Sequence, residues 1–96
     1  MDLNYLKKKL KSLKPEINKR FKVKRIGIFG SIIKGKVRKS SDVDILVDFS
    51  KTIDLFDFVA LEKYLAEQTG SKIDLVSLKA LRPEFKDTIL KKVVYI

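Results

Sequence analysis

The sequence predicts a small α/β domain, because segments with helical and strand-like patterns alternate along its 96 residues. Three short runs rich in β-branched residues are bounded by glycine-containing or polar turns, as is typical of strands. Three longer segments repeat their apolar residues at the spacing of an amphipathic helix. We therefore expect residues 1–96 to form a single domain that buries about 60–70% of the surface of its unfolded chain.

The N-terminal part predicts a helix followed by a strand. The helix is indicated by five apolar residues at helical spacing, namely Leu3, Leu6, Leu10, Leu13 and Ile17. Pro15 is expected to bend or break this helix, because proline removes a backbone donor. Residues 23–29 carry β-branched and aromatic side chains and end at a Gly-Ser pair, so they predict a strand that leads into a tight turn.

The turn after this strand has residue types that suit a phosphate. Gly30 can adopt backbone angles closed to other residues, and it lets a phosphate approach the main chain closely. Ser31 is a good N-cap for a short helix over residues 32–34, whose free N–H groups would face an anion. Gly35 would end that helix. Residues 36–41 then predict a polar, basic loop.

The second half of the chain predicts two strands that alternate with two helices. The strands are expected at residues 42–49 and 71–77. Asp54 would cap a helix that runs to about residue 69 and ends at Gly70. Pro83 suits the first turn of a last helix. The apolar residues that these two helices are expected to bury are Leu55, Phe58, Leu61, Tyr64, Leu65, Phe85, Ile89 and Val93.

Three aspartates on the predicted strands indicate a metal-assisted phosphoryl-transfer site. Asp42 and Asp44 are two positions apart, so their side chains point to the same face of a strand. Two such carboxylates repel each other unless a cation lies between them. Oxygen-rich sites with open positions suit Mg²⁺, and two ions about 3.5–4 Å apart stabilise both oxygens of an in-line displacement. Asp74 would join the same face if its strand is a neighbour, which the sequence alone does not show.

The order of these features resembles the signature of the DNA polymerase β-like nucleotidyltransferase superfamily. The signature is Gly30-Ser31, ten intervening residues and Asp42-Val43-Asp44, and the likeness to minimal nucleotidyltransferases extends over almost the whole chain. The resemblance implies a small mixed β-sheet with helices packed mainly on one side. It also implies that the three aspartates, Asp74 included, are the catalytic ligands of two Mg²⁺ ions.

The same resemblance implies that Gly30 and Ser31 hold the triphosphate of ATP. The chain departs from the family pattern at Ile32-Ile33-Lys34, where members often carry arginine and alanine. Lys34 would supply a positive charge for nucleotide binding, but without the bidentate fork of an arginine.

The minimal nucleotidyltransferases that the chain resembles are paired with a helical toxin, a ribonuclease of the HEPN family. The resemblance implies Mg²⁺-dependent transfer of AMP from ATP to a hydroxyl, that of a toxin tyrosine, by the antitoxin of a type VII toxin–antitoxin pair. Two alternatives stay open. One is a catalytically weak antitoxin that acts by stoichiometric contact, and the other is a nucleotidyltransferase that acts on RNA ends or a small molecule.

Composition limits these functions. The chain has no cysteine for a disulfide or thiolate site and no histidine to activate a nucleophile. The absence of a long apolar run or signal core predicts a cytoplasmic protein without a membrane partner. The net charge is +10, and residues 1–41 hold 14 Lys and Arg against 2 acidic residues. This half would attract an anionic nucleotide. RNA is a less favoured partner, because no aromatic residue interrupts the lysines of residues 7–14.

Overall fold

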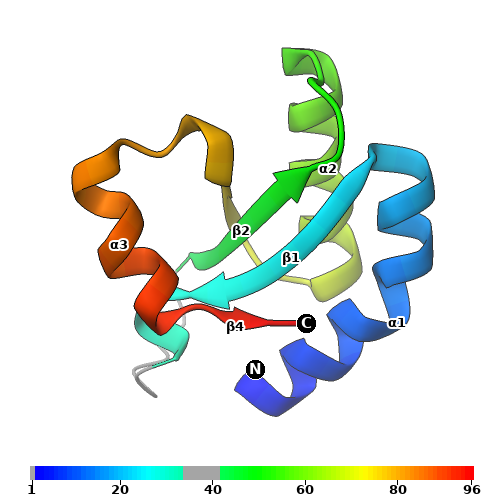
Figure 1. Ribbon diagram of the computed structural model, residues 1–96. Helices are drawn as coiled ribbons and strands as arrows, with labels where there is room; N and C mark the ends of the chain where they lie inside the picture. The colour runs from blue at the N-terminus through cyan, green and yellow to red at the C-terminus, as the bar shows by residue number, and fades with distance from the viewer. Residues whose placement is uncertain (1, 34–41) are drawn as a thin grey trace.

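A computed structural model describes residues 2–33 and 42–96 as one sheet with helices around it (Figure 1). In chain order the elements are α1 (Leu3–Phe21), β1 (Val23–Phe29), the 3₁₀ turn η1 (Gly30–Ile32), β2 (Val43–Phe49), α2 (Leu55–Thr69), β3 (Ile73–Ser77), the 3₁₀ turn η2 (Leu78–Ala80), α3 (Pro83–Lys92) and β4 (Val94–Tyr95). The strand order is β3-β2-β1-β4. β2 and β3 are parallel, while β1 is antiparallel to both of its neighbours, so the sheet is mixed as expected.

One face of this sheet carries the core, and α1 and α2 cover that face. Alternate residues of each strand point into the core, as the period of a strand requires. The core side chains that are fully buried include Leu6, Leu10 and Ile17 of α1, Ile26 and Ile28 of β1, Ile45 and Val47 of β2, and Leu61 and Leu65 of α2. The prediction that helices pack mainly on one side is therefore confirmed.

The third helix lies apart from this core. α3 contributes no buried side chain, and Figure 1 shows it beside the end of the sheet where β1 stops. Val93, which directly follows α3, packs against Gly27 on the sheet face opposite the core. A Cβ atom at Gly27 would lie 2.6 Å from Val93 Cγ2, so the close approach of this segment requires glycine there. This packing places α3 beside the turn that follows β1.

The helix ends follow the sequence signals closely. Asp54 caps α2, because its side chain accepts a hydrogen bond from the Asp57 backbone N–H at 2.8 Å. Gly70 ends α2 in the left-handed conformation, with φ of +69°, and donates its N–H to the Ala66 carbonyl. Pro83 begins α3 as predicted. The three signals therefore mark both ends of α2 and the start of α3.

Several sequence predictions need correction. α1 does not end at Pro15 but continues to Phe21, because its residues beyond the proline pack into the core. The turn after β1 is the single 3₁₀ turn η1 and includes Gly30, whereas the predicted helix began at residue 32. β4 was not predicted at all. Lys34, Gly35 and the predicted basic loop lie outside the described residues.

Two residues predicted to be buried are exposed. Leu55 at the start of α2 is 73% exposed, and Phe85 in α3 is 56% exposed. The helical periodicity was read correctly, but it does not tell which apolar residues the core has room for. Among residues 2–33 and 42–96, no helix combines the length and the apolar character that a membrane crossing needs.

Candidate active site

Asp44 and Asp74 lie side by side on neighbouring parallel strands. The register of β2 and β3 pairs these two residues directly, and neighbouring strands are about 4.8 Å apart. Val43 and Ile45 flank Asp44 and point into the core, so Asp44 points to the opposite face. Asp42 immediately precedes β2 and shares that face by its spacing. The sheet thus brings together the aspartates that the sequence could not place relative to one another.

Gly30, the first residue of η1, contacts Asp44 from the side of β1. Phe29, the last residue of β1, pairs with Asp44 in the antiparallel register. Gly30 follows with φ of +83°, a conformation that favours glycine. A Cβ atom at Gly30 would overlap Oδ2 of Asp44 and lie 2.9 Å from its Cγ. The turn therefore brings its main chain directly against the central carboxylate.

Asp44 is the electrostatic centre of the site. Burial raises the pKa of Asp44 from 3.8 to about 6, together with the charge of Asp74, a hydrogen bond between the two carboxyl groups, and the charge of Asp42. The ammonium of Lys72 lies 3.9 Å from Asp42 Oδ1, but both groups are open to solvent, so the pair is weak. The three carboxylates are thus close enough to repel one another without a cation among them.

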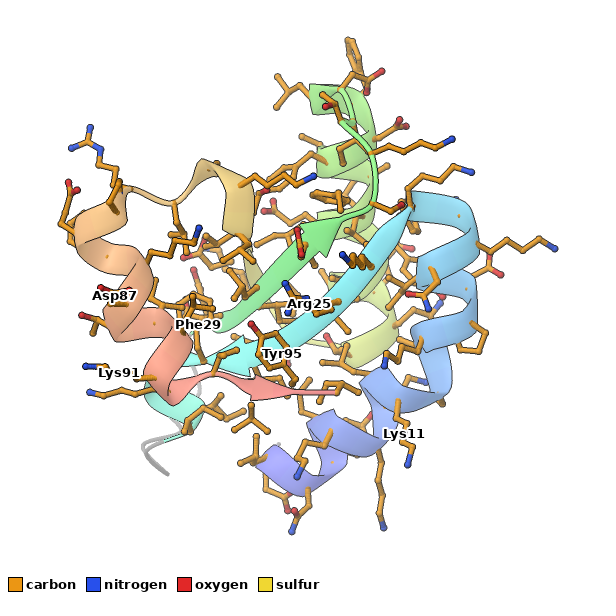
Figure 2. All side chains as sticks on the ribbon, viewed as in Figure 1. Lys11, Arg25, Phe29, Asp87, Lys91 and Tyr95 are labelled. Atoms are coloured by element: carbon orange, nitrogen blue, oxygen red, sulfur yellow. The ribbon has the colours of Figure 1, made fainter. Side chains whose placement is uncertain are left out.

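The other aspartate of β2 does not belong to this group. Asp48 is only 7% exposed, and its Oδ2 accepts a hydrogen bond from Arg25 Nη2 at 3.0 Å. The Arg25 guanidinium also lies 5.7 Å from the ring centre of Tyr95, and Figure 2 shows these two side chains together on the front of the sheet. Asp48 therefore has its own cation, in contrast to Asp44.

The chemistry of the three aspartates fits a hard divalent cation. Carboxylate oxygens are the ligands that Mg²⁺ prefers. Burial and, after it, the charges of Asp74 and Asp42 raise the pKa of Asp44, and a cation would offset the second of these effects. Within residues 2–33 and 42–96, no three His, Cys, Asp or Glu side chains are already gathered as a metal cluster. The protein thus supplies neighbouring ligands, and substrate phosphates or waters would complete the coordination.

The nucleotide-binding roles of Gly30, Ser31 and Lys34 all stay predictions. The side chain of Ser31 and the whole of Lys34 lie outside the described part of the chain. Conversely, no pattern in the sequence indicated that α3 adjoins the site. A cavity of about 310 Å³ lies between η1 and α3 and includes Gly30 in its lining. The i, i+4 spacing of Phe85 and Ile89 predicted a helix with an apolar side, but not where that side would lie.

The sequence and the fold both match known nucleotidyltransferases. Residues 11–96 match the family described as polymerase beta, nucleotidyltransferase. The chain belongs to this family. Among similar sequences, protein adenylyltransferase MntA of Thermococcus cleftensis is 43% identical over 83 residues, which cover 86% of this chain and 84% of MntA. The family resemblance that the Gly-Ser turn and the aspartates indicated is therefore confirmed, and this chain is a nucleotidyltransferase.

Solved structures support the same fold for this nucleotidyltransferase. A protein described as a candidate minimal nucleotidyltransferase matches with a TM-score of 0.83 and 30% identity, over 98% of this chain and 95% of the other. A toxin–antitoxin complex with AMP-PNP matches with a TM-score of 0.74 and 28% identity, over 94% and 70% of the chains. A complex of a tri-AMPylated Shewanella oneidensis HEPN toxin with an MNT antitoxin matches with a TM-score of 0.68 and 25% identity, over 99% of this chain and 71% of the other.

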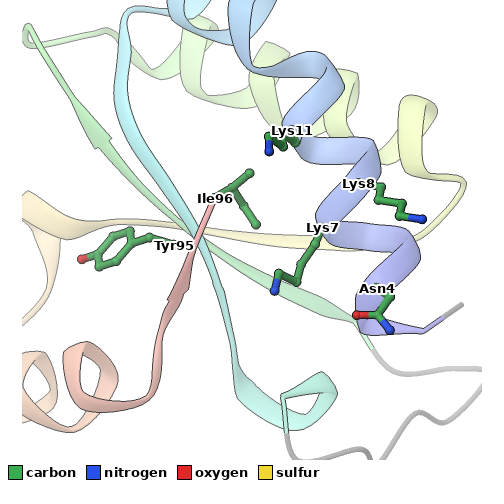
Figure 3. Close-up of a pocket in the computed structure, with 6 residues that line it drawn as sticks. All are labelled: Asn4, Lys7, Lys8, Lys11, Tyr95 and Ile96. Atoms are coloured by element: carbon green, nitrogen blue, oxygen red, sulfur yellow. The ribbon is translucent and has the colours of Figure 1, made fainter.

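A second cavity of this nucleotidyltransferase is basic and lies away from the carboxylates. It has a volume of about 450 Å³ and is lined by Asn4, Lys7, Lys8, Lys11, Tyr95 and Ile96. Figure 3 shows Tyr95 pointing away from the lysines, with Ile96 between them. The arrangement offers positive charge on α1, but it does not place an aromatic ring over the lysines as a base-stacking surface would.

Proposed function

We propose that this nucleotidyltransferase transfers AMP from ATP to a tyrosine hydroxyl of a helical HEPN-family toxin and thereby acts as its antitoxin. The observation that carries the chemistry is the direct pairing of Asp44 with Asp74, with Gly30 against Asp44. The choice of acceptor is supported by the similar chains that occur in toxin–antitoxin complexes, one of them with a tri-AMPylated toxin. The similarity to MntA supports adenylyl transfer to protein.

The site would perform this transfer mainly by positioning and electrostatics. The hydroxyl oxygen forms a bond to the α-phosphorus, the bond to pyrophosphate breaks, and the hydroxyl proton passes to a carboxylate or to water. Asp42, Asp44 and Asp74 would hold Mg²⁺, which when bound neutralises the charge that develops on the phosphates. Gly30 lets the phosphates approach the main chain, and Asp74, on the far side of Asp44 from Gly30, faces the direction from which an acceptor can approach.

An exposed apolar surface at the start of α2 supports a protein partner. Leu55 is 73% exposed, Phe56 is 85% exposed and Val59 is 43% exposed. Their spacing places them on one side of the first turns of the helix. Large apolar side chains that gather on a surface mark interaction sites. We therefore expect this surface, defined by Leu55, Phe56 and Val59, to contact the toxin.

The experiment that tests the proposal uses ATP labelled at the α-phosphate. The purified chain is incubated with Mg²⁺ and a HEPN-family protein from the same genome, and label on the toxin is measured after denaturing electrophoresis. We expect label that disappears in Asp44→Asn and persists in Asp87→Asn, a control on the exposed surface of α3. Label that survives in Asp44→Asn would refute the catalytic role of the site, and a tight complex without any label would favour an antitoxin that acts by contact.

The basic cavity favours RNA as a second candidate acceptor. Lys7, Lys8 and Lys11 present three ammonium groups from one side of α1. If RNA ends are the acceptor, label should enter RNA, and RNA binding should weaken steeply as salt concentration rises. Replacement of the three lysines by glutamine should then lower RNA labelling and leave toxin labelling unchanged.

A further inference from the structure

The strand that carries Asp74 lies at one edge of the sheet. In the order β3-β2-β1-β4, β3 pairs with β2 and, within the described part of the chain, with no other strand. The Val43 N–H donates to the Lys72 carbonyl at 2.9 Å, which fixes the direction of the backbone groups that follow on β3. Successive residues of a strand direct their N–H and C=O groups to opposite sides. The residues of β3 that direct these groups to the outer edge are Ile73, Leu75 and Ser77.

This outer edge is suited to an added strand. Between described residues, no backbone hydrogen bond outside the sheet uses the N–H or C=O of these three residues. A row of unpaired backbone groups is a template for pairing with another chain. In such strand addition, main-chain hydrogen bonds supply affinity and side-chain pockets supply specificity. RNA has no repeating N–H and C=O groups, so the edge of β3 suits a polypeptide.

A groove adjoins the same edge on the side of α2. Its volume is about 590 Å³, and most of the side chains that line it are apolar. β3 contributes residues 75–77 to the lining, and the start of α2 contributes Leu55 and Phe58. Leu55 also belongs to the exposed surface that we expect to contact the toxin. The groove therefore connects that surface with the edge of β3, beside Asp74.

The register of an added strand decides where its side chains point. Residues directly opposite each other on neighbouring strands share a face, and the strands are about 4.8 Å apart. A residue opposite Asp74 would project from the carboxylate face of the sheet, beside the place where Asp44 and Asp74 would hold a phosphate. The next residue of the added strand, opposite Leu75, would point to the other face and into the groove.

The height of the hydroxyl above the sheet favours tyrosine at the position opposite Asp74. A phosphate bound through the carboxylates lies beyond the ends of the aspartate side chains. Tyrosine carries its hydroxyl at the far end of an aromatic ring, so it reaches this level from the neighbouring strand. The hydroxyl of serine or threonine is attached to Cβ and stays close to the sheet. Acceptor residues on this edge are therefore distinguished by their length.

We propose that the acceptor segment of the partner protein binds in extended form along the outer edge of β3, an inference that rests on the proposed function. Its backbone bonds to that of Ile73, Leu75 and Ser77. Its tyrosine lies opposite Asp74, and an apolar residue next to the tyrosine occupies the groove beside Leu55. The partner is thus recognised through an extended segment in which an apolar residue neighbours the tyrosine.

Amide hydrogen exchange tests the pairing directly. The ¹⁵N-labelled chain is mixed with Mg²⁺, α,β-methylene ATP, which cannot transfer AMP, and the HEPN-family protein from the same genome, and exchange is followed by NMR. The N–H groups of Ile73, Leu75 and Ser77 should exchange about tenfold more slowly, or slower still, in the complex. Asp74 and Val76 are the internal controls, because their N–H groups point to β2 and report any general stabilisation by binding.

The second test removes one outward donor from β3. Ser77 has φ of −87° and ψ of 128°, which are near the angles of proline in an extended chain. Ser77→Pro therefore deletes the N–H at the edge and keeps the pairing with β2, whereas Ser77→Ala deletes the hydroxyl and keeps the N–H. With saturating ATP, the KM for the toxin should be about five- to tenfold higher in Ser77→Pro than in Ser77→Ala, with equal kcat. Circular dichroism checks that both variants are folded.

The third test fills the groove. Ala80 is exposed and lines the groove, so Ala80→Trp adds volume there without entering the core. Ser12→Trp is the matched control, because Ser12 is a small exposed residue of α1 outside the lining. Ala80→Trp should raise the KM for the toxin about tenfold and leave the Kd for ATP, measured without toxin, unchanged. Ser12→Trp should change neither value.

The outcomes separate this inference from the proposed function. If the unaltered chain transfers no AMP to the toxin, the proposed function fails and the inference fails with it. If transfer occurs but the exchange at residues 73, 75 and 77 changes no more than that of the two controls, this inference alone is overturned, even if Ala80→Trp raises the KM. Slow exchange of the same amides without toxin, increasing with protein concentration, would show that β3 pairs with a second copy of the chain and would also contradict the inference.

Discussion

Replacement of Gly30 by alanine tests the contact between the turn and the central carboxylate. Gly30 has φ of +83°, and a non-glycine residue in that region costs about 1–2 kcal/mol. The added Cβ would also overlap Asp44 Oδ2 and lie 2.9 Å from Asp44 Cγ, so the carboxylate or the turn has to move. Forcing an extra carbon into a packed site costs about 1–3 kcal/mol more. We expect Gly30→Ala to lose about 2–5 kcal/mol of stability in total.

Gly70→Ala is a control with the same backbone strain and no contact. Gly70 has φ of +69°, and a Cβ added there would meet nothing within 4 Å. Urea unfolding of both variants, followed by circular dichroism, should give Gly70→Ala a loss of only about 1–2 kcal/mol. Transfer of AMP, measured under conditions where both variants are folded, should fall about 100-fold or more in Gly30→Ala, because a displacement of about 1 Å is enough for such a loss. Gly70→Ala should keep its activity.

The comparison of the two variants decides the prediction. Equal unfolding free energies would show that the added Cβ at Gly30 meets no resistance from Asp44. Equal transfer rates would show that the position of Asp44 beside the turn is irrelevant to catalysis. Either result would refute the site as described, even if Gly30 remained unfavourable for alanine through its backbone angles alone.

Three other perturbations give distinct expectations. Without Mg²⁺, Asp44→Asn should stabilise the protein at pH 7.5 by about 1 kcal/mol. A pKa raised from 3.8 to about 6 corresponds to roughly 3 kcal/mol, and solvent screening reduces this value to about 1 kcal/mol. Because this pKa is higher in the folded state, the stability of the wild type should fall as pH rises through about 4 to 6. Urea titrations at pH 4 should therefore show no difference in unfolding free energy between wild type and Asp44→Asn. Phe56→Ser should leave the unfolding free energy within about 0.5 kcal/mol of wild type but weaken toxin binding in a pull-down. Arg25→Met should cost about 1–2 kcal/mol by leaving Asp48 buried without its partner, while AMP transfer by the folded protein stays unchanged.

Local sequence signals predicted most elements because their physical causes are local. The capping of α2 by Asp54 and its end at Gly70 depend on residues within one turn of each. The shared face of Asp42 and Asp44 follows from the two-residue period of a strand. The family signature then related these local signals to one fold. These are the parts of the site that a single sequence could establish.

The rest depended on contacts between residues far apart in the chain. The pairing of Asp44 with Asp74 requires β3 to lie parallel beside β2, which the sequence order permits but does not determine. β4 has only two residues and exists because β1 offers it an edge. The exposure of Leu55 and Phe85 has the same origin, since helical periodicity identifies an apolar side but not whether the sheet can cover it.

The electrostatics of the site favour catalysis over simple contact. A pKa of about 6 means that Asp44 is mostly ionised at neutral pH at an energetic cost, next to two other carboxylates. An asparagine would occupy the same space on β2 without that charge, and the Cβ of a serine or alanine at the turn would overlap Asp44, so only glycine allows this close approach. An antitoxin that acts only by binding its toxin gains nothing from either residue. A cation bound with a nucleotide would remove the repulsion, and a glycine turn beside the carboxylates would let a phosphate approach the main chain, so both residues have one common explanation in phosphoryl transfer.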